Sequence, residues 1–432
     1  MQKIKKGLDT ENGLRYSLAP FLFYRKLPSG ATITGCHLTG GVRHRKIKEE
    51  TVMKKKMVSA MLALTMVLSF VAVNACAEED HVIKIGAVCA MTGGSAVYGE
   101  GAQNAIDMAV EEINASDAEY KIEIINGGKV ADDAKDAKQA VNAYNSLMAE
   151  DPEAIVGSFF SSVTLPMAEL AADDNMLLLA TGATNYQVTQ IGPTIFRNCF
   201  IDPYQGKMAA AFAKDQGYTK AAIIYAKDDD YSNGLKDAFV ESAEANGIEV
   251  VYVGECTTTD TDFTAQATQA VGSDADFVFY PCFLDTVPLL VQQVRDAGFE
   301  GAIMGGDGWD GADTSGLEDY FENCYFTNHY SSEDTAPAVQ EFVSKYTDKY
   351  GTDSLNACAA LYYDAMYMLE EAAVNGGGSD TESLVKGMTG MKFSGVAGDI
   401  YLDENGDAIK PVVVNTYEDG QIKWLKTIAP EE

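Results

Sequence analysis

Two short segments carry groups suited to binding an anion. "GSFFSSVTLP" (157–166) presents hydroxyls, including that of Ser161, just before Pro166, a residue that commonly opens a helix. "ATGATNYQVT" (180–189) is again small and rich in hydroxyls. The free N–H groups at a helix start favour an anion, and neighbouring hydroxyls strengthen that preference. These segments therefore predict a site for a carboxylate.

Three later segments have a different character. "AKDDDYSNG" (226–234), "PCFLDTVP" (281–288) and "GGDGWDG" (305–311) present the acid Asp307 together with the aromatic residues Tyr231, Phe283 and Trp309. An acid with aromatic walls, placed opposite an anion site, suits a zwitterion with an apolar side chain. A plainer reading stays open, because hydroxyls and glycines after strands are ordinary loop and cap residues and Asp307 could be a solvated turn acid.

The sequence shows no arrangement typical of catalysis or metal binding. After residue 77 the chain has two histidines, His81 and His329, and no G-x-S-x-G elbow, P-loop or H-E-x-x-H motif. "GEG" at 99–101 is only a fragment of a dinucleotide fingerprint. The cysteines of this part are widely spaced and form no CxxC pair: Cys89, Cys199, Cys256, Cys282, Cys324 and Cys358. Several fall inside apolar runs, where we expect small buried thiols. We expect no catalytic residues, no cofactor and no metal.

The elements that must position these groups alternate along the chain. Apolar runs predict strands at 82–88, 121–125, 154–160, 176–180, 195–199, 221–226, 249–253, 276–282, 302–305 and 324–329. Helical periodicity lies between them at 103–113, 134–148, 165–173, 205–214, 233–244 and 287–297. Residues 336–373 are strongly helical, and 398–428 predict a β-hairpin, turned by "DENGD", and a further strand.

This alternation predicts the α/β class. Continuous apolar strands between helices are typical of parallel sheets covered on both faces, and two sets of about five βα units predict two doubly wound lobes. In such sheets ligands bind beyond the carboxyl ends of the strands. Each of the polar segments above follows a predicted strand, so we expect them to converge.

Charge is divided unevenly along the chain. Residues 1–77 carry a net charge of +9, whereas the remainder carries −41. Such an acidic surface repels phosphate backbones, so nucleic-acid binding is not expected.

The basic front end contains a secretory signal peptide at 53–77. Three lysines precede an apolar run, which ends at the small-x-small site Ala75-Cys76-Ala77. A permanent membrane anchor is the alternative, although the run is slightly short for a span. Residues 1–52 are then expected to be a non-native extension. We expect export, either with cleavage after Ala77 or with lipidation of Cys76 at a cell surface.

The chain from 82 to 428 resembles the branched-chain amino-acid-binding proteins of ABC importers, which are type I periplasmic binding proteins. The resemblance is carried by "IKIGAVCAMTGGSAVYGEGAQNAIDMAVEEINA", "AIVGSFFSSVTLPMAEL", "LLLATGATN", "YAKDDDYSNGLKDAF" and "IMGGDGWDG". It implies a first lobe of 82–200 plus 331–394 and a second of 201–330 plus 395–428. Three hinge crossings would join them near 200–203, 328–331 and 394–398.

The resemblance also implies a ligand-binding set. The ligand's carboxylate would meet the hydroxyl and N–H of Ser161 and the N–H of Thr184. Its ammonium would meet the Gly182 carbonyl, the Thr184 hydroxyl and the Asp307 carboxylate, with Ala183 in the same loop. The implied mechanism is capture by closure of the two lobes over the ligand.

Aromatic residues complete this set. Tyr98 and Tyr231 would close over the ligand, and Phe159, Phe160 and Phe283 would line the side-chain pocket. Asp307 stands where the best-known members carry a glutamate. Phe160 replaces a disulfide cysteine, and Phe159 is bulkier than the usual leucine. The choice among branched-chain, aromatic and other neutral amino acids, or a related amide or aromatic acid, therefore stays open.

As partners, the resemblance implies a small-molecule amino-acid ligand and the permease subunits of an ABC transporter, with the binding protein acting as a monomer. An alternative is a ligand-binding sensor working with a separate receptor.

Overall fold

A computed structural model describes residues 81–430 of the chain. The predicted extension (1–52), the predicted signal peptide (53–77) and Cys76 lie outside the described residues. Within 81–430, no helix combines the length and the apolar character needed to cross a membrane.

The first sheet is parallel and has the strand order β2-β1-β4-β5-β6, with β3 paired to β1. Its strands are β1 (Val82–Cys89), β2 (Lys121–Ile124), β3 (Ala131–Asp132), β4 (Ala154–Val156), β5 (Leu177–Ala180) and β6 (Ile195–Arg197). Because β4 and β5 are buried along their whole length, they consist of apolar residues without alternation.

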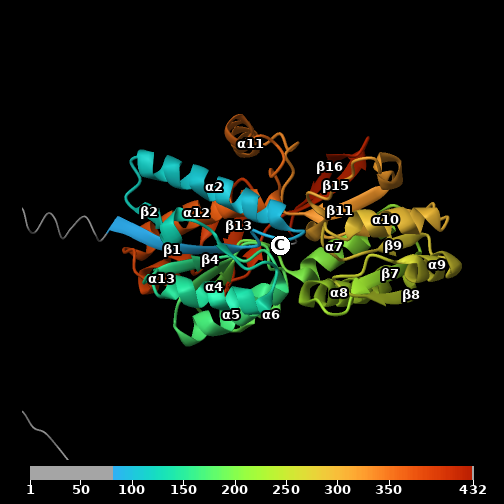
Figure 1. The fold of residues 1–432 in the computed structure, drawn as a ribbon, viewed down its shortest axis with the longest axis horizontal. Helices are drawn as coiled ribbons and strands as arrows, with labels where there is room; N and C mark the ends of the chain where they lie inside the picture. Colours follow the sequence, from blue (N-terminus) through green and yellow to red (C-terminus); the bar gives the residue numbers. More distant parts are fainter. Residues whose placement is uncertain (1–80, 431–432) are drawn as a thin grey trace, which may run out of the picture. The chain divides into compact units, whose positions relative to one another are not determined.

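Helices cover both faces of this sheet. α2 (Ala96–Ala115) packs against α12 (Ala357–Gly376) on one face, and α4 (Ala137–Met148) packs against α5 (Ser161–Asp173) on the other (Figure 1). α12 also packs against α13 (Thr381–Met388), and α11 (Pro337–Tyr350) contacts α2. We call this assembly the first lobe.

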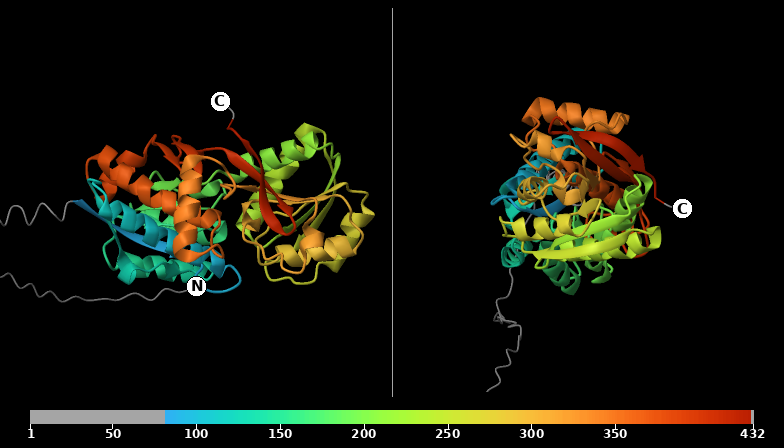
Figure 2. Two further views of the ribbon diagram at one scale, coloured as in Figure 1. Left: turned by 90° about the horizontal axis from the view of Figure 1, so that it is seen from above. Right: turned by 90° about the vertical axis from the view of Figure 1, so that its right-hand side faces the viewer.

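The second sheet has seven strands in the order β16-β15-β11-β10-β9-β7-β8. Five are parallel, namely β7 (Lys220–Ala226), β8 (Glu249–Cys256), β9 (Phe277–Phe279), β10 (Ala302–Gly305) and β11 (Cys324–Asn328). β15 (Val412–Glu418) and β16 (Gln421–Ile428) add an antiparallel edge. Figure 2 shows these two late strands running beside the yellow and green elements of the second sheet.

The helices of this second lobe also pack in pairs. α7 (Asp202–Asp215) lies against α8 (Asp230–Asn246), and α9 (Thr264–Gly272) lies against α10 (Val287–Asp296). The short elements of the two lobes are α3 (Ile125–Gly128), α6 (Gln187–Gln190), η2 (Asp307–Trp309) and η3 (Glu318–Phe321).

The predicted order of strands and helices is confirmed, with local differences. The strand predicted at 154–160 ends at Val156, because Gly157 adopts φ +112° and the next helix begins at Ser161. The helical stretch 336–373 is two helices. Gly351, at φ +83°, ends α11, and Asn356 caps α12 by accepting a hydrogen bond from the Ala359 N–H.

A small third sheet precedes the last two strands. Residues 392–409 form a small antiparallel sheet of β12 (Lys392–Gly395), β13 (Gly398–Leu402) and β14 (Ala408–Ile409), with the predicted hairpin turn at 403–407. Asp364 of α12 accepts hydrogen bonds from the N–H groups of Val396 and Ala397. The Gly406 carbonyl in the hairpin turn accepts a hydrogen bond from the Arg197 N–H, so the β13–β14 hairpin also packs with the first lobe. The chain then passes to the second sheet between β14 and β15, at 410–411. The other passages lie between β6 and α7 (198–201) and between β11 and α11 (329–336).

Candidate functional site

Each sheet has one point at which the order of its strands along the chain reverses direction, and predicted site residues follow the strands on either side of this point. In the first sheet this point lies between β1 and β4, and in the second between β7 and β9. Ligands in doubly wound sheets bind at this position, beyond the carboxyl ends of the strands. Tyr98 in α2 follows β1, and Phe159–Ser161 follow β4. Tyr231 in α8 follows β7, and Phe283 follows β9.

The predicted carboxylate-binding segments meet in the first lobe. Ser161 is the buried first residue of α5, and its Oγ accepts a hydrogen bond from the Asn185 N–H at 3.1 Å. A side chain at Gly182 would place its Cβ 2.3 Å from the Phe159 ring, so only glycine fits there. The helix start after β4 and the loop after β5 thus form one buried surface, and a helix start is a favourable place for an anion.

A buried arginine holds the 182–185 loop in place. Arg197 Nη1 donates to the Ala183 carbonyl at 2.7 Å and to the Asn185 carbonyl at 3.0 Å. Its Nε lies 2.8 Å from Asp407 Oδ1. The Thr184 carbonyl accepts from the Asp202 N–H at 2.9 Å, which ties this loop to the start of α7 in the second lobe.

The acid of the second lobe, Asp307, lies in η2 and is 1% exposed. Its Oδ1 accepts from Gln205 Nε2 at 2.7 Å, and its Oδ2 lies 3.2 Å from His329 Nε2. Burial lowers the pKa of His329 to about 4, against the opposing effect of Asp307. His329 is therefore neutral near pH 7, and its contact with Asp307 is a hydrogen bond rather than an ion pair.

Burial also affects Asp202, which opens α7 close to this acid. It raises the pKa of Asp202 well above its usual range.

Two tyrosines from different lobes meet at the turn that carries Asp307. Tyr98 Oη lies 3.1 Å from the Gly308 carbonyl oxygen and 2.8 Å from that of Asp310. Tyr231 Oη accepts from the Gly308 N–H at 3.3 Å. Both phenols are buried, so a side chain from each lobe reaches the same turn.

The remaining predicted aromatics form a continuous wall between them. Ring centroids lie 4.5 Å apart for Tyr98 and Phe159, 5.8 Å for Phe159 and Phe160, 5.0 Å for Phe160 and Phe283, and 4.7 Å for Phe283 and Tyr231. All five rings are at most 4% exposed. The five aromatic residues therefore belong to one buried cluster that spans both lobes.

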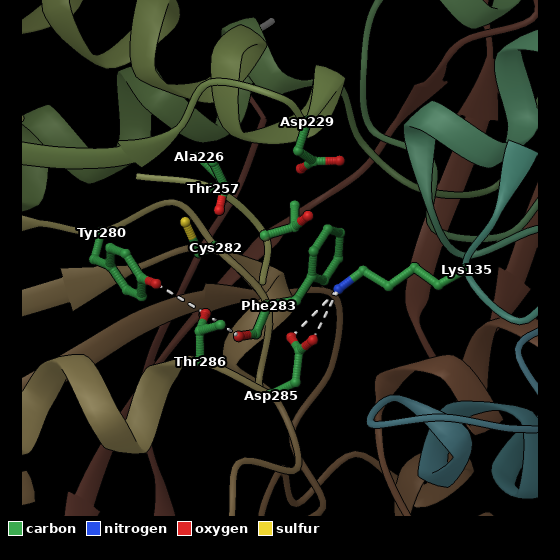
Figure 3. A pocket seen from close by; sticks show the side chains of 10 residues that line it. Lys135, Ala226, Asp229, Thr257, Tyr280, Cys282, Phe283, Asp285 and Thr286 are labelled. Carbon is green, nitrogen blue, oxygen red and sulfur yellow. Dashed lines mark hydrogen bonds and ion pairs between the residues drawn. The ribbon is translucent and has the colours of Figure 1, made fainter. Parts of the chain in front are cut away.

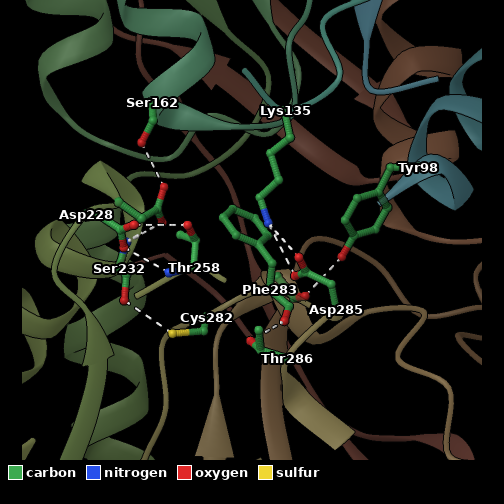
Figure 4. A network of polar contacts seen from close by, with 12 residues as sticks. Tyr98, Lys135, Ser162, Asp228, Ser232, Thr258, Cys282, Phe283, Asp285 and Thr286 are labelled. Atoms are coloured by element: carbon green, nitrogen blue, oxygen red, sulfur yellow. Dashed lines mark hydrogen bonds and ion pairs between the residues drawn. The ribbon is translucent and has the colours of Figure 1, made fainter. Parts of the chain in front are cut away.

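At the mouth of this cluster, polar residues of the two lobes contact each other. Lys135 Nζ lies over the Phe283 ring and points to the Asp285 carboxylate (Figure 3). Ser162 Oγ donates to Asp229 Oδ1 at 2.7 Å (Figure 4). A cavity of about 270 Å³ opens between these contacts, and its lining includes Lys135, Phe160, Asp229 and Asp285.

Sequence reasoning did not identify Gln205, His329 and Lys135 as site residues. Gln205 lies just after the expected crossing at 200–203, and His329 lies within the one expected at 328–331, which is the signal that could have found them. Lys135 is a cation in a strongly acidic segment, but nothing in its neighbours predicts that it reaches the other lobe.

Two further features of the described residues concern possible metal ligands and the cysteines. Residues 81–430 contain no group of three or more His, Cys, Asp or Glu side chains placed to hold a metal ion. The predicted buried thiols are confirmed, since all six cysteines of this part are free and buried.

One parallel and one mostly parallel sheet, each covered by helices, with polar and aromatic groups gathered between them, define a two-lobed solute-binding fold. Residues 82–421 match the family described as periplasmic binding protein, and the chain belongs to this family. The family consists of solute-binding proteins that act outside the cytoplasm.

Several known proteins are similar to this chain. The Leu/Ile/Val-binding protein homolog 1 of Brucella suis biovar 1 (strain 1330) is 28% identical over 382 residues, covering 87% of this chain and 97% of the relative. The structure of the leucine binding protein LivK from Thermotoga maritima MSB8 is 31% identical, has a TM-score of 0.75, and covers 81% of this chain and 99% of its own. LivJ from Streptococcus pneumoniae, solved in complex with isoleucine, is 25% identical with a TM-score of 0.72 and covers 81% and 100%.

Proposed function

We propose that this chain is the extracytoplasmic solute-binding component of an ABC importer and captures a neutral amino acid between its lobes, without chemical change. One observation carries the proposal. A buried helix start with hydroxyl and N–H donors, at Ser161, shares a closed aromatic cluster with a buried acid, Asp307. A zwitterionic head group matches both, because closure strengthens charged hydrogen bonds and penalises any charge left unmatched.

The aromatic wall supports an apolar side chain on the ligand. Phe159, Phe160 and Phe283 offer faces and edges but no hydrogen-bonding groups. The names of similar proteins, which include leucine-binding and Leu/Ile/Val-binding proteins, agree with this chemistry. The ligand class we propose therefore comprises branched-chain and aromatic amino acids.

Calorimetry of the purified protein against the neutral amino acids tests the proposal. We expect at least one branched-chain or aromatic amino acid to bind and to raise the melting temperature, because a ligand that binds only the folded state stabilises it. The amine and methyl ester derivatives of that amino acid lack the carboxylate and should bind far more weakly. Equal binding of the derivatives, or turnover of the ligand, would refute the proposal.

We also propose that the segment 53–77 directs export. The mass of the secreted protein separates the two forms considered for its N-terminus. A chain that begins at Glu78 indicates simple cleavage after Ala77, whereas a chain that begins at a lipid-modified Cys76 indicates anchoring.

A further inference from the structure

The acid of the proposed ammonium site is held by side chains from two segments that connect the lobes. Gln205 lies in the first turn of α7, directly after the crossing at 198–201. His329 directly follows β11, at the crossing 329–336. They contact different oxygens of Asp307, at 2.7 Å and 3.2 Å, and all three side chains are at most 1% exposed.

The roles of donor and acceptor follow from the chemistry of the groups. The 3.2 Å contact with Asp307 Oδ2 is made by His329 Nε2, so the tautomer that carries its proton on Nε2 is the one that can donate to this carboxylate. The other nitrogen, Nδ1, has no hydrogen-bond partner among residues 81–430. Instead, the imidazole packs on the ring of Phe200, with centroids 3.9 Å apart. Packing on Phe200 therefore holds the imidazole in place, and the one side-chain hydrogen bond of His329 is with Asp307.

Gln205 is oriented in a similar way. Its Nε2 donates to Asp307, while its Oε1 has no partner among the described residues. A Cβ added to Gly306 would lie 3.0 Å from this Oε1 and 2.3 Å from Tyr231 Oη. The free acceptor of Gln205 thus lies beside the turn and the tyrosine that border the proposed ammonium position.

We propose that Gln205 and His329 are positioning residues, which fix the Asp307 carboxylate as the acceptor of the ligand's ammonium group. Selectivity for an amino acid over the same acid without its amino group then depends on them. Gln205 and His329 contact different oxygens of the carboxylate, and a carboxylate oxygen can accept more than one hydrogen bond, so these contacts leave room for the ammonium. This inference rests on the proposed function and extends it to the residues that set head-group selectivity.

A purely structural role makes a different prediction from a positioning role. If the two side chains only stabilise the crossings, their loss weakens binding of both ligands of a pair by the same factor. If they position Asp307, their loss weakens binding of the amino acid and leaves its deaminated analogue nearly unaffected. The ratio of the two dissociation constants therefore separates the roles.

The test compares two pairs, leucine with 4-methylpentanoate and phenylalanine with 3-phenylpropanoate, by calorimetry on the intact protein. Gln205→Met and His329→Leu remove the donors, whereas His329→Gln retains an N–H donor. Gln103→Met is the matched control, because Gln103 Nε2 also donates to a carboxylate, that of Asp107 at 2.9 Å, within α2.

We expect Gln205→Met and His329→Leu each to lower the ratio of the two dissociation constants, which measures the preference for the amino acid, by about tenfold or more. This is the size of effect expected when a hydrogen bond to a carboxylate is lost. His329→Gln should restore most of the preference, and Gln103→Met should leave it unchanged. An unchanged ratio in both donor-free variants would overturn the inference alone. A wild-type protein without preference for the amino acid would overturn it together with the proposed function. If His329→Leu fails to fold, Gln205→Met decides.

Discussion

Lys135 Nζ lies 3.3 Å from Asp285 Oδ1, and this ion pair joins a loop of the first lobe to a loop of the second. The same ammonium lies 5.3 Å from the centroid of the Phe160 ring and 4.3 Å from that of Phe283. It thus contacts groups that belong to different lobes and that come together only when the lobes meet. The pair is half-buried, so part of its attraction is screened by water.

Loss of this interlobe pair should weaken ligand binding modestly. We expect Lys135→Ala to lower the affinity about two- to fivefold, because a partly exposed ion pair contributes at most about 1 kcal/mol. The effect should appear mainly as faster ligand release and should shrink at high salt. Stopped-flow dissociation at low and high salt measures it.

A matched control lies entirely within the second lobe. Lys227 and Glu255 form a more exposed pair at 3.2 Å that does not connect the lobes. Lys227→Ala should leave the release rate unchanged. Equal effects of the two substitutions on the release rate would show that the interlobe position of Lys135 does not matter for ligand release.

Removal of the acid in the cluster should nearly abolish binding. Asp307→Ala leaves the ligand's ammonium buried without its partner, and removing one member of a buried pair costs about 3–5 kcal/mol. We therefore expect a loss of at least about 100-fold in calorimetric affinity for the best amino acid. Asp313→Ala, which removes an exposed acid from the following loop, is the control and should bind normally. Unchanged affinity of Asp307→Ala would refute the assigned role.

Gly182 should tolerate no side chain. In Gly182→Ala the new Cβ would lie 2.3 Å from the Phe159 ring, and either the ring or the loop must move. Because this loop also provides Thr184, we expect at least a tenfold loss of affinity. Gly272→Ala is the control, since a Cβ there meets nothing within 4 Å. Titration of both variants with the same ligand checks the prediction, which fails if they bind alike.

The sequence predicts the elements well because their signals are local. Apolar runs and helical periodicity identify the strands and helices, and the rule for doubly wound sheets places their loops together. The lobe against which the 398–409 hairpin packs could not be predicted in this way, because it depends on the contact of Gly406 with Arg197, far away in the sequence. For the same reason the pairing of Gln205 and His329 with Asp307 could not be foreseen.

Stability should depend on pH through Asp310, whose carboxyl oxygen accepts a hydrogen bond from the Ala357 N–H at 2.6 Å. Burial raises the pKa of Asp310 to about 6, above its usual 3.8. The folded protein then binds this proton more tightly than the unfolded chain does. The contribution of Asp310 to the free energy of unfolding therefore falls as the pH rises from about 4 to about 6, and stays constant above that.

Asp310→Asn isolates this contribution, because an amide keeps the acceptor and cannot ionise. The variant should gain about 2 to 3 kcal/mol relative to the wild type between pH 4 and pH 7, which corresponds to a shift of about two pKa units. Denaturant unfolding of both proteins at several pH values measures the difference. Asp313→Asn, at an exposed acid, should show no gain of this sign, because the pKa of Asp313 is lowered by its hydrogen bonds with Ser315. If the difference in the free energy of unfolding between Asp310→Asn and wild type did not change with pH, the prediction would be wrong. Asp310 would then have the same pKa in the folded and unfolded states.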